Sequence, residues 1–159
     1  MPEFWPASRR SKFSDWIDRE IDTANNRKLE SNEVTQLSEI YNLSDQTSGI
    51  RRMLAPGFEA RIIVGDQSML SIVTVEPNAE GSIHSHPEEQ WGILLQGSGI
   101  RTQDGVDYAV EVDDFWRTPG NVLHGFKAGS RGAKILDIFS PPREAYRKSG
   151  SGFATDDIE

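Results

Sequence analysis

The chain has 159 residues, contains no cysteine and carries a formal net charge of −8 at pH 7. This length predicts one well-buried domain, and the lack of cysteine excludes disulfides and thiolate metal sites. The acidic balance argues against a nucleic-acid partner, no stretch approaches the roughly 20 apolar residues that cross a membrane, and the start lacks the features of a secretion signal. We therefore expect a cytoplasmic protein that binds neither nucleic acid nor membrane.

Residues 1–33 are expected to form an N-terminal extension with one short amphipathic helix. Phe13, Trp16, Ile17 and Ile21 recur at helical spacing, and Ser14 could cap the helix. Such an apolar stripe usually packs on its own domain or on a second subunit. The acidic polar face argues further against a membrane surface.

Residues 34–143 have the pattern of a small β-sandwich or barrel. Runs rich in Val, Ile, Leu and Thr, such as 61–64 and 70–75, are separated at short intervals by Gly, Pro, Asn and Asp. Asp104-Gly105 predicts a two-residue hairpin, because both turn positions need positive φ. Pro119-Gly120 suits the central positions of a type II turn.

Two predicted strands carry an apolar face opposite the face that holds a candidate site residue. Alternation in 90–96 places Trp91, Ile93 and Leu95 on the face opposite Gln90, and the strand 134–139 places Leu136 and Ile138 opposite Asp137 and Phe139. The faces with Trp91 and Ile138 are too apolar for water, so a second sheet, the N-terminal segment or another subunit should cover them. A homodimer is expected on this ground.

The tail 144–159 is polar and is expected to be loosely held, without a chemical role.

The histidines of the chain are His84, His86 and His124, with Gln90 between the second and third. Neutral imidazole is the commonest protein ligand for a divalent transition metal. Two histidines that are two residues apart in an extended strand lie on one face, close enough for one ion. Taken alone, that pair is equally compatible with two surface histidines.

The stretch from His84 to Gly97 resembles the first motif of the cupin family: two histidines around one residue, a ligand three or four residues later, then six residues and a glycine. Asp113 to His124 resembles the second motif, with Pro119 five residues before the histidine. Asp113 and Asn121 stand where the motif has glycine, but both residue types tolerate left-handed backbone geometry. The resemblance implies an all-β fold, a cupin jelly-roll barrel over residues 34–143.

The resemblance also implies that His84, His86, Gln90 and His124 hold a divalent transition metal, either Zn, Ni, Fe or Mn. The third ligand is normally glutamate. A neutral glutamine leaves the ion a harder Lewis acid, better suited to polarising a carbonyl or hydroxyl than to stabilising high-valent iron. Two alternatives stay open: Glu89 swings in as a ligand, or the three histidines suffice.

Leu136 to Arg143 is similar to the C-terminal signature of the small cupins of pectin and alginate breakdown, which open unsaturated uronates to linear keto sugars. This likeness implies that Asp137, Phe139 and Arg143 line the pocket and matter for activity. Independently, an acid on an apolar inward strand face is costly without a role or partner, and a guanidinium can clamp a carboxylate. An ordinary ion pair between Asp137 and Arg143 is the alternative.

These observations predict a metal-dependent lyase or isomerase whose small-molecule substrate is an oxygenated carboxylate such as an unsaturated uronate. The metal would polarise a hydroxyl or carbonyl, Asp137 would move a proton and Arg143 would fix a carboxylate. Three alternatives remain: a cupin dioxygenase with iron or nickel, a non-catalytic metabolite-binding cupin, and an enzyme like the zinc-dependent polyketide cyclases, which share the four ligand types.

Overall fold

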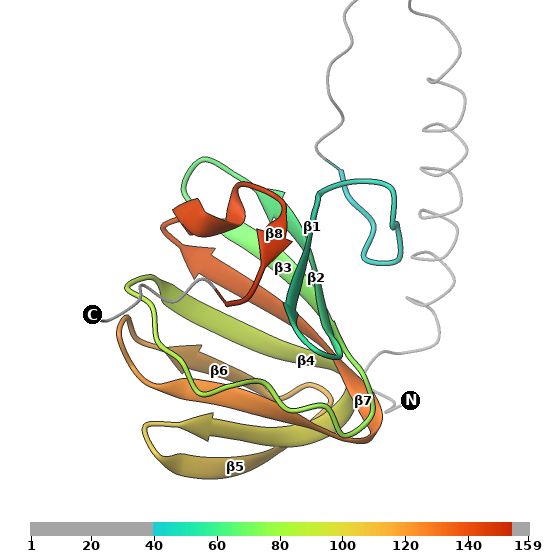
Figure 1. Ribbon diagram of the computed structural model, residues 1–159, viewed down its shortest axis with the longest axis vertical. Helices are drawn as coiled ribbons and strands as arrows, with labels where there is room; N and C mark the ends of the chain where they lie inside the picture. Colours follow the sequence, from blue (N-terminus) through green and yellow to red (C-terminus); the bar gives the residue numbers. More distant parts are fainter. Residues whose placement is uncertain (1–39, 154–159) are drawn as a thin grey trace, which may run out of the picture. The chain divides into compact units, whose positions relative to one another are not determined.

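The computed structural model describes residues 40–153, so the predicted N-terminal helix lies outside the described residues. The strands are β1 (Ile50–Ala55), β2 (Phe58–Val64), β3 (Met69–Val75), β4 (Glu89–Gln103), β5 (Val106–Glu111), β6 (Phe115–Thr118), β7 (His124–Ser140) and β8 (Gly150–Ser151), with a 3-10 helix, η2 (Glu144–Tyr146), before the last (Figure 1). The predicted all-β fold is confirmed. Within residues 40–153, no helix has the length and apolar character of a membrane span.

The strands form one sheet in the order β5-β4-β7-β3-β2-β1-β8, and β6 pairs with β4. The long strands β4 and β7 pair with each other, while β7 also pairs with β3 through residues 133–139. Figure 1 shows β1, β2, β3 and β8 on one side and β5 and β6 on the other. The apolar core that lies between them includes Leu54, Phe58, Ile62, Met69, Val73, Leu94, Ile135 and Phe139. This is the β-sandwich form of a jelly-roll barrel.

Asp104 and Gly105 have φ values of 51° and 75°, which confirms the predicted hairpin between β4 and β5. The turn before His124 is one residue later than predicted. Asn121 takes the left-handed conformation (φ 65°), and the Val122 amide donates to the Pro119 carbonyl at 3.3 Å. A Cβ on Gly120 would lie 2.2 Å from the Pro87 carbonyl oxygen, so close backbone approach requires glycine there.

The predicted alternation in β4 is confirmed: Gln90 and Leu94 are buried, whereas Trp91 is 38% exposed. In the pairing with β7, a bulge between Leu94 and Gln96 then adds one residue on the β4 side. Because side chains alternate along a strand, one extra residue reverses which positions point inward. Arg101 is consequently buried on the same inner face as Gln90.

The expectation of a loosely held tail is wrong for residues 144–153. Tyr146 of η2 is only 1% exposed, and β8 pairs in parallel with β1. The buried guanidinium of Arg52 donates to the carbonyls of Ala145, Ser151 and Gly152, at 3.1, 2.6 and 2.9 Å. These hydrogen bonds satisfy three carbonyl groups of the tail and so hold it against the barrel.

Candidate metal centre

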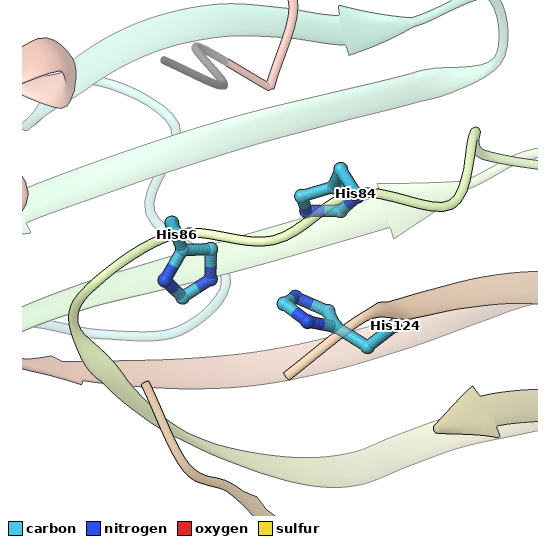
Figure 2. A group of neighbouring side chains, drawn as sticks. All are labelled: His84, His86 and His124. Atoms are coloured by element: carbon cyan, nitrogen blue, oxygen red, sulfur yellow. The ribbon is translucent and has the colours of Figure 1, made fainter. Parts of the chain in front are cut away.

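The three histidine rings converge at the inner face of the barrel. His84 and His124 exchange backbone hydrogen bonds of 2.9 and 2.8 Å across an isolated antiparallel bridge, so their ring centroids lie only 4.5 Å apart. The ring of His86 lies 4.9 Å from that of His124. One possible ligand atom from each residue lies within 4.8 Å of the other two, and Figure 2 shows the rings turned toward one another.

The Nδ1 side of each ring faces an oxygen. His84 Nδ1 lies 2.9 Å from the Ser82 carbonyl, and His124 Nδ1 lies 2.7 Å from the Val122 carbonyl. His86 Nδ1 lies 3.2 Å from Glu88 Oε2. At His84 and His124 these hydrogen bonds fix the tautomer that leaves Nε2 free to bind a metal, whereas the His86 contact is an ion-pair contact without hydrogen-bond alignment. The buried His124 Nε2 has no hydrogen-bond partner among residues 40–153, as expected of a ligand atom.

Burial keeps all three imidazoles neutral. It lowers the pKa of His84 and of His86 to about 4, and the pKa of His124 to about 2. Neighbouring arginines contribute to this lowering, because a second positive charge disfavours the imidazolium. Neutral imidazole is the form that coordinates metal, so the residues present fit a divalent transition metal.

Gln90 lies beside the histidines with its amide held in one orientation. Its Nε2 donates to Asp137 Oδ1 at 2.7 Å, while its Oε1 lies 3.1 Å from His86 Nε2. The carboxylate of Asp137 accepts only, so it selects the amide nitrogen and leaves the amide oxygen toward the rings. That oxygen is the atom a metal would take.

Glu89 points the other way. Its carboxylate accepts from Arg117 Nε at 2.7 Å and from Trp91 Nε1 at 2.9 Å on the outer face. Glu89 and Gln90 are consecutive in β4, so their side chains lie on opposite faces of the sheet. This placement argues against Glu89 as the fourth ligand.

Asp137 is buried, and that burial raises the pKa of its carboxyl to about 6. The hydrogen bond from Gln90 and the charges of Arg101 and Arg143 oppose this rise. Arg101 is itself buried, donates to Thr118 Oγ1 at 2.6 Å, and has its pKa lowered to about 10 by burial. A carboxyl with this pKa exchanges a proton near neutral pH.

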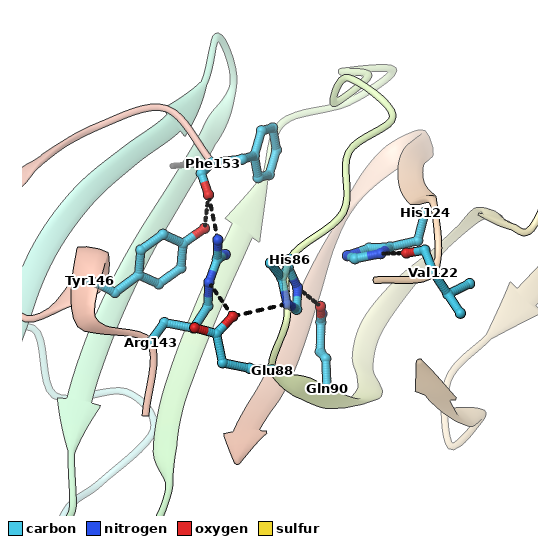
Figure 3. Close-up of polar contacts among 8 residues, drawn as sticks. All are labelled: His86, Glu88, Gln90, Val122, His124, Arg143, Tyr146 and Phe153. Atoms are coloured by element: carbon cyan, nitrogen blue, oxygen red, sulfur yellow. Dashed lines mark hydrogen bonds and ion pairs between the residues drawn. The ribbon is translucent and has the colours of Figure 1, made fainter. Parts of the chain in front are cut away.

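Arg143 lies immediately before η2 and is 2% exposed. Its guanidinium carbon stacks 4.2 Å from the centre of the Tyr146 ring and 5.5 Å from that of Phe139. Its Nη2 donates to the Phe153 carbonyl at 2.9 Å, and the Tyr146 hydroxyl donates to the same oxygen (Figure 3). Its Nε lies 3.3 Å from Glu88 Oε2. Asp137 accepts a hydrogen bond from Gln90. These contacts of Asp137 and Arg143 are therefore with residues other than each other.

One cavity of about 40 Å³ brings most of the predicted site residues together. Its lining includes His84, Gln90, His124, Asp137, Phe139 and Arg143. Ser71 and Trp116 also line this cavity, and within the described chain Ser71 Oγ and Trp116 Nε1 have no hydrogen-bond partner. Buried polar atoms without partners are costly, so their presence favours a polar ligand.

The ring of Phe153 stacks on His84, with centroids 4.2 Å apart, and forms part of the cavity wall. Sequence reasoning missed Phe153 and Tyr146, although two aromatic residues in a polar tail were a usable signal. It also missed Arg101, because the bulge in β4 cannot be read from the chain, and the inward direction of Glu88.

The sequence model of the Cupin domain family matches residues 71–139. No curated protein matches the chain. Among solved structures, KdgF from Halomonas sp. is 25% identical with a TM-score of 0.56, over 60% of this chain and 88% of that chain. An RmlC-like cupin from Shewanella frigidimarina NCIMB 400 is 23% identical with a TM-score of 0.59, over 67% and 96%. Salicylate 1,2-dioxygenase from Pseudoaminobacter salicylatoxidans is 16% identical with a TM-score of 0.53, over 56% and 28%.

The residues that the family model matches contain the three histidines, Gln90 and Asp137. The jelly-roll barrel, the convergence of those side chains on one cavity and the likeness to KdgF agree with that match. Residues 71–139 therefore match the Cupin domain family, and the barrel that carries them has the cupin fold.

Proposed function

We propose that this cupin is a metal-dependent lyase or isomerase of a small oxygenated carboxylate, with an unsaturated uronate as its substrate. The observation that carries the proposal is that His84 and His124 of the histidine cluster line one cavity together with a buried carboxyl and a buried guanidinium. The resemblance of the sequence to the uronate ring-opening cupins and the likeness of the barrel to KdgF support this choice.

His84, His86 and His124 would hold the metal through Nε2, with Gln90 Oε1 as a neutral further donor. A divalent transition metal bound there supplies a Lewis acid for a substrate hydroxyl or carbonyl. Because all four ligands are neutral, the full charge of the ion acts on the substrate.

Asp137 would transfer the proton that ring opening or tautomerisation requires. Its raised pKa, about 6, keeps both protonation states accessible near neutral pH, as a general acid or base needs. The 2.7 Å bond from Gln90 fixes one carboxyl oxygen, Oδ1, so that the other is available for this transfer.

Arg143 would bind the substrate carboxylate. Its stacking on Tyr146 and Phe139 sets the plane of the guanidinium, and burial strengthens a charge-assisted hydrogen bond there. The substrate carboxylate would replace the Phe153 carbonyl on Nη2. Substrate hydroxyls would then satisfy Ser71 Oγ and Trp116 Nε1.

Substrate access requires the chain near Phe153 to move. A cavity of about 40 Å³ holds water or an ion, whereas pockets for small organic ligands measure roughly 300 to 1,000 Å³. Phe153 is held by ring stacking on His84 and by two hydrogen bonds to its carbonyl, and substrate contacts would replace both.

The test is a screen of unsaturated uronates with metal-loaded protein. Loss of the conjugated enol absorbance measures turnover, and the concentration of dissolved oxygen is recorded at the same time. We expect turnover with no oxygen consumed. Oxygen consumption in step with turnover would assign the protein to the dioxygenases instead. Binding of uronates without turnover by fully metal-loaded protein would contradict the enzymatic proposal.

A further inference from the structure

We propose that Glu88 is a positioning residue that joins the metal ligand His86 to Arg143. The inference rests on the proposed function only in taking His86 as a ligand. It assigns a role to a carboxylate that does not touch metal or substrate, and it predicts that metal binding responds to Arg143 through Glu88.

One carboxylate oxygen serves both groups. Glu88 Oε2 lies 3.2 Å from His86 Nδ1 and 3.3 Å from Arg143 Nε. Figure 3 shows the carboxylate between the imidazole and the guanidinium. The three side chains are 15%, 2% and 3% exposed, in the order Glu88, His86, Arg143. The oxygen is therefore within ion-pair distance of both groups, although neither contact has the alignment of a hydrogen bond.

At His86, the carboxylate acts as the outer partner that orients a metal ligand. When Nε2 binds a metal, the ring proton lies on Nδ1, and a carboxylate beside Nδ1 would stabilise that form and make the imidazole a stronger donor. His84 and His124 have backbone carbonyls in the same place. His86 is therefore the ligand whose metal affinity depends on a charged neighbour.

At Arg143, the same carboxylate offsets a buried positive charge close to the metal site. Arg143 Nε and His86 Nδ1 contact the same carboxylate oxygen, so the guanidinium charge lies close to that ring. A cation bound by His86 would experience repulsion from that charge, and the negative charge of Glu88 stands between the two. Removing the charge of Glu88 would leave that repulsion without an offset, because charges interact strongly in a buried setting.

The adjacent residue supplies a matched control. Glu89 has the same side chain, but it contacts Arg117 and Trp91 on the outer face. Glu88→Gln and Glu89→Gln remove the same charge, one residue apart, with nearly unchanged volume. A general effect of net charge on metal binding would appear in both variants, whereas the proposed role appears only in Glu88→Gln.

The experiment is a titration of the metal-free full chain with Zn²⁺ by calorimetry, after thermal unfolding has shown that each variant folds. We expect Glu88→Gln to weaken zinc binding about 10- to 100-fold and Glu89→Gln to change it less than about twofold. Glu88→Asp keeps the charge but places it farther from His86 and Arg143, so its zinc affinity should lie between those of the other two variants. This variant replaces Glu88→Gln in the test if Glu88→Gln does not fold. Unchanged affinity in the folded Glu88 variants overturns the inference.

A double-mutant cycle tests the connection to Arg143. If Glu88 separates the two charges, Arg143→Gln changes zinc affinity little in the wild-type background but restores part of it in the Glu88→Gln background. Additive effects overturn the connection. A wild-type chain that binds no Zn²⁺ refutes the proposed metal site itself, which is a different result from normal binding that ignores Glu88.

Discussion

The two faces of the paired strands β4 and β7 depart from the usual distribution of an antiparallel sheet, because polar and charged side chains are buried beside the apolar core. The inner face carries Gln90, Arg101 and Asp137, all buried, whereas the outer face carries Trp91 and the partly exposed Ile138. Antiparallel sheets commonly bury apolar side chains and expose polar ones. Burial of polar and charged groups lowers the stability of the folded protein. Such a cost is common where side chains perform chemistry.

The largest expected effect comes from Asp137 on the inner face. Asp137→Asn keeps an oxygen that accepts from Gln90 Nε2 but cannot transfer a proton. We expect turnover of an unsaturated uronate to fall about 10²- to 10⁴-fold while zinc affinity is retained. Steady-state kinetics with calorimetry on one preparation checks both. Full activity in this variant would remove Asp137 from the mechanism.

The same substitution should stabilise the metal-free protein at neutral pH. The folded pKa of Asp137, about 6, lies above its ordinary value, so the folded state holds this proton more tightly than the unfolded state. Its contribution to stability is therefore greatest at low pH and is lost as the pH rises through about 6. Thermal unfolding from pH 4 to pH 8 should show Asp137→Asn gaining relative to wild type as pH rises. A constant difference across this range would contradict the assignment.

Arg143 should show the next largest effect. Arg143→Lys keeps a charge but loses the planar pair of donors, so we expect the KM for a carboxylate substrate to rise about 10- to 100-fold with a smaller change in kcat. Arg117→Lys is the control, since Arg117 pairs with Glu89 on the outer face. Equal changes in the two variants would show that the inner position has no special role.

A smaller effect is expected when the cavity wall is cut back. Phe153→Ala removes the ring stacked on His84, so the substrate has less to displace and kcat/KM should rise a few-fold, on the order of 1 kcal/mol. Tyr108→Ala, at an exposed aromatic of β5, serves as the control. Stopped-flow measurement of uronate binding separates access from chemistry. A lower kcat/KM would mean that the ring contacts substrate rather than excluding it.

The outer face should affect assembly and leave chemistry nearly unchanged. The homodimer stays a prediction, based on the half-buried or exposed Trp91, Ile93, Leu136 and Ile138. Trp91→Glu places a charge on this face, so we expect light scattering to show a shift from dimer to monomer with less than about a twofold change in kcat. A monomeric wild-type chain would show that another element covers this face.

Sequence reasoning succeeded where local rules act. Period-two alternation placed Gln90 inward and Trp91 outward, and the Asp104-Gly105 hairpin followed from its φ requirements. It failed where pairing between distant strands determines the direction of a side chain or a contact. A bulge turned Arg101 inward, and Glu88, which precedes β4, follows no alternation. The contact between Gln90 and Asp137 spans 47 residues and depends on sheet register, which no local pattern specifies.

Elemental analysis of the purified full chain measures whether the inner face holds a metal. After reconstitution and removal of loose ions, we expect about one divalent transition-metal ion per wild-type chain. His124→Ala should lose most of it, because the His124 ring supplies a buried nitrogen that has no protein partner among the described residues. No metal in the wild type, or equal metal in His124→Ala, would show that these side chains do not form a metal site.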